Sequence, residues 1–168
     1  GNKLSTDDLK AMNLRNIARD EDLLITAETT DENVLVPVGE DGAYHVSTVD
    51  EFLSAIGSDR TIVLEAELYD LSTASDYGTP GGDYYFWKES YDGPELVITN
   101  VQDLTIDTAK ATGDNTAKHH TVVATPRYAN VLNFQYCDNI TLMNFTAGHT
   151  EEPGVCSGGV LNFQGCRE

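Results

Sequence analysis

A segment that is repeated near the end of the chain constrains the fold more than any other feature of the sequence. VLNFQYC begins at Val131 and VLNFQGC begins at Val160, so five identical residues and a cysteine recur 29 residues apart. A second alignment, of residues 97–106 with residues 133–142 at an offset of 36, places Leu104 on Ile140. Repeats of about 20 to 50 residues are typical of solenoids and arrays.

The composition of the repeated segments favours strands over helices. The segments are short and rich in Val, Ile, Thr and Phe, and apolar and polar residues alternate in them, which excludes helical repeats. Turns such as YCDN are too tight for the strands of an antiparallel meander to pair again in register. The pattern therefore predicts parallel strands that stack on each other about 4.8 Å apart.

Helices are expected only in the first third of the chain. In residues 48–57, Thr48 and Glu51 have the spacing of a capping box, and apolar residues recur at helical spacing. Residues 5–19 also read as a short helix, because Ser5 or Thr6 can cap it. The acidic, Thr-rich residues 20–33 are expected to form a linker or an extended arm.

Several motifs resemble the right-handed parallel β-helix proteins of the pectin-lyase-like superfamily. Residues 46–72 are similar to its N-terminal amphipathic helix and first strand, although Glu67-Leu68-Tyr69 stands where Gly-Thr-Tyr is usual. CDNITLMN (residues 137–144) is similar to its repeated strand signature. More narrowly, WKESYDGPELVI, PRYANVLNF and GHT…CSGGVLNF resemble exported β-helix proteins of gut anaerobic bacteria, a group without a settled activity.

The resemblance implies a fold class and a division of the chain. The expected fold is an all-β solenoid, a right-handed single-stranded parallel β-helix with an N-terminal α-helical cap. Residues 1–43 are expected to form an N-terminal helix and acidic arm, and residues 44–168 the cap and first coils. Because the last repeat would leave an open strand edge, we expect the β-helix to be truncated at its C-terminus.

The net charge of the chain limits the classes of molecule that it is expected to bind. The chain has 168 residues, enough for one domain, and 28 acidic against 10 basic side chains give a net charge of −18. This charge repels phosphate backbones and anionic membranes, which excludes nucleic acid and favours a neutral or basic partner. No apolar run approaches the roughly 18 residues that span a bilayer.

The N-terminus of the chain bears on its localisation, and its cysteines bear on whether it binds a metal or cofactor. The chain begins at Gly1 without an initiator Met, so we expect a removed export signal and a secreted or cell-surface protein, which we take to be a monomer. Cys137, Cys156 and Cys166 have no metal-type spacing, so neither a metal nor a cofactor is expected. The resemblance leaves Ca²⁺ bound by carboxylates as an alternative.

The candidate ligand-binding residues are aromatic or charged. Aromatic faces stack on sugar rings, and a neighbouring Arg or His recognises hydroxyl or carboxylate groups. This reasoning selects Tyr85, Trp87, Arg127, Tyr128 and His149. The alternative for the aromatic run at residues 84–87 is a flap that packs over an open corner of the fold.

The candidate catalytic residues fall into three groups. Asp103 and Asp138 lie near strand ends, and inverting glycoside hydrolysis needs two carboxyl groups about 6.5–9.5 Å apart. The resemblance to β-helix lyases adds Arg127 as a base. Cys156 follows His149 by seven residues in one loop, which suggests a nucleophile and its base. The alternatives are solvated carboxylates and a histidine that stabilises a turn.

Cys137 and Cys166 occupy the same position of the repeat, which suggests stacked side chains. A buried ladder of small apolar side chains and a disulfide both fit this position.

These observations lead to three functional hypotheses. The first is an exported β-helix protein that binds or acts on polysaccharide or a cell-surface glycan. Its full-length form would be a polysaccharide lyase or glycoside hydrolase, and this segment would be inactive alone. The second is a non-enzymatic cell-surface scaffold or adhesion module of unknown ligand, in which residues 84–87 pack as structure. The third is a Cys-dependent hydrolase that uses Cys156 and His149.

Overall fold

The computed structural model describes residues 36–109, 120–151, 154 and 156–168. These residues belong to one compact unit that begins at Val34. The helix predicted for residues 5–19 and the arm predicted for residues 20–33 lie outside the described residues. No helix in the described part of the chain is long and apolar enough to cross a membrane.

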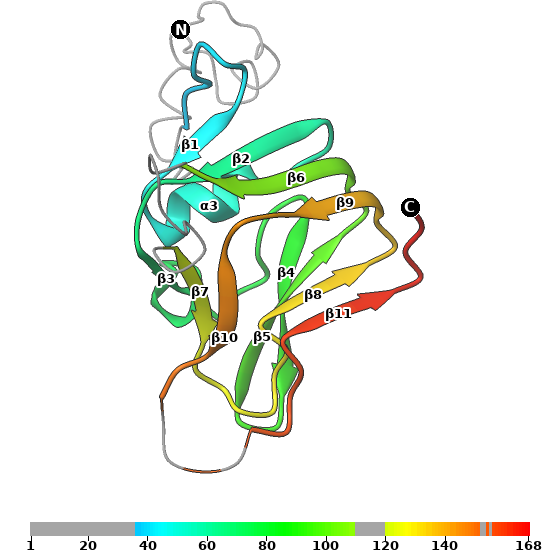
Figure 1. The fold of residues 1–168 in the computed structure, drawn as a ribbon. Helices are drawn as coiled ribbons and strands as arrows, with labels where there is room; N and C mark the ends of the chain where they lie inside the picture. The colour runs from blue at the N-terminus through cyan, green and yellow to red at the C-terminus, as the bar shows by residue number, and fades with distance from the viewer. Residues whose placement is uncertain (1–35, 110–119, 152–153, 155) are drawn as a thin grey trace, which may run out of the picture. The chain divides into compact units, whose positions relative to one another are not determined.

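The described residues are mostly β-strand, arranged in three small sheets with one short α-helix (Figure 1). The strand orders are β1-β2-β6-β9, β10-β7-β3 and β11-β8-β5-β4. The elements are β1 (Tyr44–Val46), α3 (Val49–Ala55), β2 (Arg60–Leu64), β3 (Leu68–Asp70), the 3-10 helix η1 (Leu71–Thr73), β4 (Tyr85–Ser90), β5 (Gly93–Thr99), β6 (Gln102–Thr108), β7 (Thr121–Ala124), β8 (Leu132–Gln135), β9 (Asp138–Leu142), β10 (Thr146–His149) and β11 (Leu161–Gln164).

The repeated segments pair with one another in the predicted register. β8 and β11 are parallel neighbours, and Leu132 pairs with Leu161. β6 and β9 are also parallel, with Leu104 opposite Ile140, which confirms the offset of 36. In β8 and β11, each side chain therefore lies beside a side chain of the same type, on the same face of the third sheet.

The predicted fold class is wrong. The described residues form three small sheets, parallel and mixed, and one short α-helix, rather than an all-parallel solenoid that begins with a helical cap. The physical reason lies in the segment before β5. The turn Tyr91-Asp92 reverses the chain, so β4 pairs antiparallel with β5 and Ser90 lies opposite Gly93. β4 therefore occupies an edge of the third sheet with an antiparallel strand.

The helix expected at residues 48–57 is confirmed as α3. Thr48 is the N-cap, and its Oγ1 accepts a hydrogen bond from Glu51 N at 3.1 Å. The Glu51 carboxylate accepts from Ser47 N at 2.6 Å, so the two side chains satisfy backbone donors reciprocally. Phe52 and Leu53 face the core and are buried.

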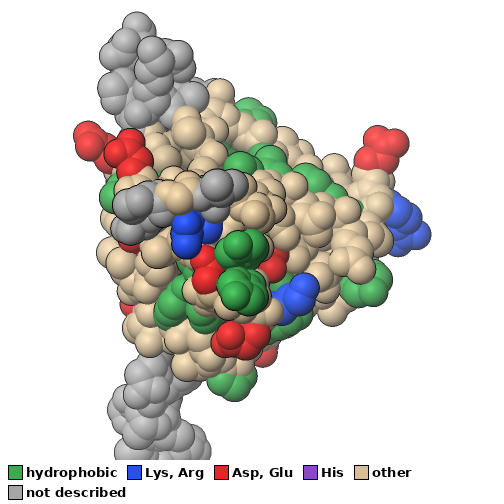
Figure 2. All heavy atoms as spheres, turned by 90° about the horizontal axis from the view of Figure 1, so that it is seen from below, with side chains coloured by type: hydrophobic (Ala, Val, Ile, Leu, Met, Phe, Trp, Pro, Cys, Tyr) green, Lys and Arg blue, Asp and Glu red, His purple; other side chains and the backbone are tan. Residues whose placement is uncertain are grey.

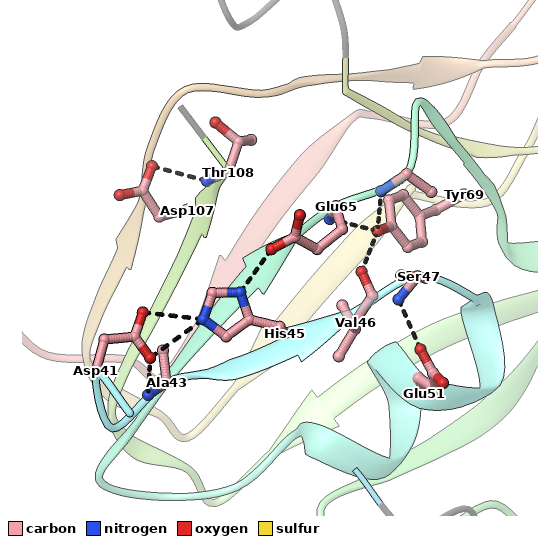
Figure 3. A network of polar contacts seen from close by, with 11 residues as sticks. Asp41, Ala43, His45, Val46, Ser47, Glu51, Glu65, Tyr69, Asp107 and Thr108 are labelled. Atoms are coloured by element: carbon pink, nitrogen blue, oxygen red, sulfur yellow. Dashed lines mark hydrogen bonds and ion pairs between the residues drawn. The ribbon is translucent and has the colours of Figure 1, made fainter. Parts of the chain in front are cut away.

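Tyr69 of β3 ties the core to the backbone around it (Figure 3). Its ring is fully buried, and its hydroxyl donates to Val46 O at 2.6 Å. The same oxygen accepts from Glu65 N at 2.9 Å and from Ala66 N at 2.8 Å. Burial raises the pKa of Tyr69 above its ordinary value, so the hydroxyl keeps its proton.

Candidate functional site

Three turns at the lower end of the view in Figure 1 are joined to one another by hydrogen bonds. The Asp92 carboxylate, between β4 and β5, accepts from Arg127 N at 2.8 Å and from Tyr128 N at 3.1 Å. Arg127 O in turn accepts from Ser157 N at 2.9 Å, in the loop before β11. We call Tyr91, Asp92, Arg127, Tyr128 and His149 the loop-end site.

Two exposed tyrosines form the aromatic part of this site. The side chain of Tyr91 is 86% exposed and that of Tyr128 is 45% exposed. Their ring centroids are 4.9 Å apart and the rings are tilted by 67°, an edge-to-face arrangement that leaves ring surface open to solvent. Seen from below, hydrophobic side chains gather between acidic and basic ones (Figure 2).

Asp92 fixes the backbone beneath the two rings. Desolvation raises its pKa, but hydrogen bonds from the backbone N–H groups of Arg127 and Tyr128 outweigh this effect and hold the pKa below its ordinary value. The carboxylate therefore stays ionised at neutral pH. It acts as an acceptor that ties the turn carrying Tyr91 to the turn carrying Tyr128.

His149 supports the same turn from β10. Its Nε2 lies 2.8 Å from Ala129 O. A carbonyl oxygen only accepts, so Nε2 carries the proton and donates. The structure thus brings Arg127, Tyr128 and His149 together, as three of the five predicted ligand-binding residues.

The Arg127 side chain borders the loop before β11. A Cβ added to Gly154 would lie 1.7 Å from Arg127 Nη1, so the guanidinium group lies directly against this glycine, whose φ of +122° disfavours other residues. Cys156 in this loop is exposed and free. Among the described residues no hydrogen bond joins Cys156 to His149, whose Nε2 donates to Ala129 O instead, so the nucleophile–base pair of the hydrolase hypothesis stays a prediction.

Trp87 and Tyr85 lie outside the loop-end site and pack as structure. Trp87 is 8% exposed, and its Nε1 donates to Asp76 at 3.1 Å. The Tyr85 hydroxyl donates to the other oxygen of the same carboxylate at 2.5 Å. Burial and this hydrogen bond raise the pKa of Tyr85. The Tyr77 ring completes the cluster in an edge-to-face arrangement, with the centroids of the Tyr77 and Trp87 rings 5.0 Å apart.

The two candidate catalytic carboxylates, Asp103 and Asp138, each have a hydrogen-bond partner of their own. Asp138 is held by Arg167, with Nη2 at 2.8 Å and Nε at 3.1 Å. The hydrogen bond from Arg167 lowers the pKa of Asp138. Asp103 accepts from Asn139 Nδ2 at 2.6 Å. No hydrogen bond or ion pair between described residues links either carboxylate to the loop-end site.

A second polar cluster surrounds His45 on β1 (Figure 3). His45 Nδ1 lies 2.5 Å from Glu65 Oε2, and Nε2 lies 2.9 Å from Asp41 Oδ2. Hydrogen bonds to Glu65 first and Asp41 second raise the pKa of His45. Within the described ranges no group of three or more His, Cys, Asp or Glu side chains is arranged to hold a metal ion.

Sequence reasoning missed Tyr91, Asp92 and the His45 cluster. A signal for the first two was present, because SYDG lies between two strand-like runs and Asp before Gly is typical of a turn. The contact of Asp92 with residues 35 positions away has no local signal. For the His45 cluster, the signal in the sequence was Asp41, whose carboxylate lies four residues before His45.

Comparison with known proteins finds no match to any family model, curated protein or solved structure. The resemblance to pectin-lyase-like proteins and the expected export therefore stay predictions.

Proposed function

We propose that this protein binds a neutral polysaccharide through the loop-end site. The observation that carries the proposal is the exposed edge-to-face pair of Tyr91 and Tyr128, held on a fixed backbone by Asp92. Tyrosine rings offer a large apolar face at low conformational cost, and sugar rings stack on such faces through their C–H groups. Because the planes of the two rings are tilted by 67°, the rings can contact one sugar unit from two directions.

The charge of the chain supports a neutral ligand over an anionic one. A net charge of −18 repels polyanions, and the ionised Asp92 is adjacent to Tyr91 in the chain and accepts a hydrogen bond from Tyr128 N. Arg127 at the rim can donate to hydroxyl groups, since its guanidinium group carries five N–H donors. Binding without catalysis is the simpler assignment, because the carboxylates of Asp103 and Asp138 are bonded to Asn139 and Arg167 instead of to residues of the loop-end site.

The proposal is tested by a polysaccharide-binding screen on the full chain. Tyr91→Ala and Tyr128→Ala are each expected to weaken binding at least tenfold, which corresponds to about 1.4 kcal/mol. Tyr136→Ala is the matched control, because Tyr136 is also exposed, at 61%, but lies at the opposite end of β8. Binding that is equal in all three variants would overturn the assignment.

The second candidate function is a non-enzymatic surface or adhesion module. The packing of Trp87 and Tyr85 on Asp76 favours it, because that hypothesis expects the aromatic run to be structural. The same screen separates the two functions. If no polysaccharide binds the wild-type chain, the surface-module hypothesis replaces polysaccharide binding.

A further inference from the structure

The hydroxyl group of Tyr77 lies beside the loop-end site, in the segment between η1 and β4. A Cβ added to Gly93 would lie 3.5 Å from the Tyr77 hydroxyl oxygen and 2.7 Å from Pro126 Cγ. Gly93 comes two residues after Tyr91 in the chain. Pro126 comes two residues before Tyr128. The hydroxyl group therefore lies where the turn that carries one exposed tyrosine packs against the turn that carries the other.

Two packing contacts hold Tyr77 in place. The rings of Tyr77 and Trp87 are arranged edge to face, with their centroids 5.0 Å apart and their planes tilted by 72°. Trp87 is itself fixed, because it is buried and its Nε1 donates to Asp76. A Cβ added to Gly78, the next residue after Tyr77, would lie 3.4 Å from Pro94 Cγ at the start of β5. These contacts position the Tyr77 ring without the use of its hydroxyl group.

The hydroxyl group of Tyr77 is open to a ligand. Among the described residues it has no hydrogen-bond partner, whereas the hydroxyl groups of Tyr69 and Tyr85 donate to Val46 O and to a carboxylate. In the described ranges, the enclosed side-chain oxygens without a partner are those of Thr108 and Thr150, so the Tyr77 oxygen is in contact with solvent. A tyrosine hydroxyl group both donates and accepts hydrogen bonds, and here both functions are open to a bound molecule.

The surroundings of Tyr77 favour a neutral group as the partner of its hydroxyl group. Burial is the main cause that raises the pKa of Tyr77, and nearby carboxylates raise it further. These carboxylates belong to Asp70, Asp92 and Glu89. The phenol therefore keeps its proton at neutral pH and can donate it in a hydrogen bond. The same carboxylates repel an anionic group, whereas a sugar hydroxyl group is neutral and can accept from the phenol.

We propose that Tyr77 is a specificity-determining residue of the loop-end site, and that its hydroxyl group donates a hydrogen bond to a hydroxyl oxygen of the polysaccharide that stacks on Tyr91 and Tyr128. This inference rests on the proposed function and deepens it. Aromatic faces accept many sugars, because stacking depends on apolar area. A hydrogen bond from a fixed polar group depends on where the ligand carries its hydroxyl groups, so Tyr77 supplies the selectivity that the two exposed rings lack.

Tyr77→Phe tests this role, because it removes the hydroxyl group and keeps the ring that packs on Trp87. Affinity electrophoresis of the full chain in gels that contain galactomannan, xyloglucan or laminarin, three neutral polysaccharides, measures binding. In a polysaccharide that retards the wild type, Tyr77→Phe is expected to bind about three- to tenfold more weakly, as for the loss of one hydrogen bond between neutral groups. The midpoint of its urea denaturation is expected to stay that of the wild type, since no hydrogen bond between described residues is lost.

Tyr85→Phe is the matched control, because the Tyr85 ring also lies edge to face with Trp87 but its hydroxyl group donates to Asp76. Its urea midpoint is expected to fall, while its polysaccharide binding stays within about twofold of the wild type. Equal binding by Tyr77→Phe and the wild type, or an equal loss of binding in Tyr85→Phe, overturns the role of Tyr77 and leaves the two exposed tyrosines as the binding site. If none of the three polysaccharides retards the wild type, the proposed function fails, and the role of Tyr77 fails with it.

Discussion

Removal of the Tyr69 hydroxyl is the sharpest test of how the core is held. In Tyr69→Phe the ring stays in place, but Val46 O, Glu65 N and Ala66 N lose a hydrogen-bond partner. Glu65 N and Val46 O still bond to each other at 2.9 Å, so the substitution orphans one donor, Ala66 N. An unsatisfied buried donor costs about 1–3 kcal/mol, and Ala66 is only partly buried, so the cost here lies at the lower end of this range. We therefore expect the free energy of unfolding to fall by about 1 kcal/mol.

Urea denaturation followed by the fluorescence of Trp87, the single tryptophan, measures this change. The midpoint should fall while the slope m stays the same, because the folded core remains compact. Tyr91→Phe is the matched control, since the exposed Tyr91 is expected to change stability by less than about 0.5 kcal/mol. A loss below about 0.5 kcal/mol in Tyr69→Phe would refute the account of this network.

Two further predictions concern titratable groups. The pKa of His45 is raised by Glu65 and Asp41, so the stability from this cluster is complete below about pH 6.5 and is lost as pH rises through the folded-state pKa. His45→Gln should flatten this dependence in unfolding measured across pH, and an unchanged profile would contradict it. Among the cysteines, the exposed Cys156 should react first with iodoacetamide and Cys137 last, because burial raises the pKa of Cys137. Mass spectrometry of timed samples gives the order, and early labelling of Cys137 would contradict its burial.

The strand pairing was predictable because the paired strands repeat the same residues in the sequence. Identical residues at a fixed offset place the same side chains on the same face, so Leu132 opposite Leu161 follows from the sequence alone. The helix at Thr48 was predictable for a similar reason, since its cap and its apolar face lie within eight residues. In both cases a recognisable pattern of residue types in the sequence marks the structural element.

The fold class and the site depended on contacts that no local pattern encodes. The repeat pattern predicts parallel strands throughout and gives no sign of the antiparallel turn at Tyr91-Asp92, so the predicted direction of β4 in the third sheet is wrong. Asp92 then meets Arg127 across 35 residues, and this contact decides where the exposed aromatic rings lie. Composition alone favoured Trp87, the largest aromatic side chain, but Asp76 holds its indole in the interior.

Polysaccharide binding by the wild-type chain and by Tyr91→Ala is the measurement that tests the central claim most directly. Affinity electrophoresis in gels that contain neutral or anionic polysaccharides compares both proteins under the same conditions. The account predicts that a neutral polysaccharide retards the wild-type chain, that an anionic one does not, and that Tyr91→Ala migrates freely in both. Retardation of Tyr91→Ala equal to that of the wild type would contradict it.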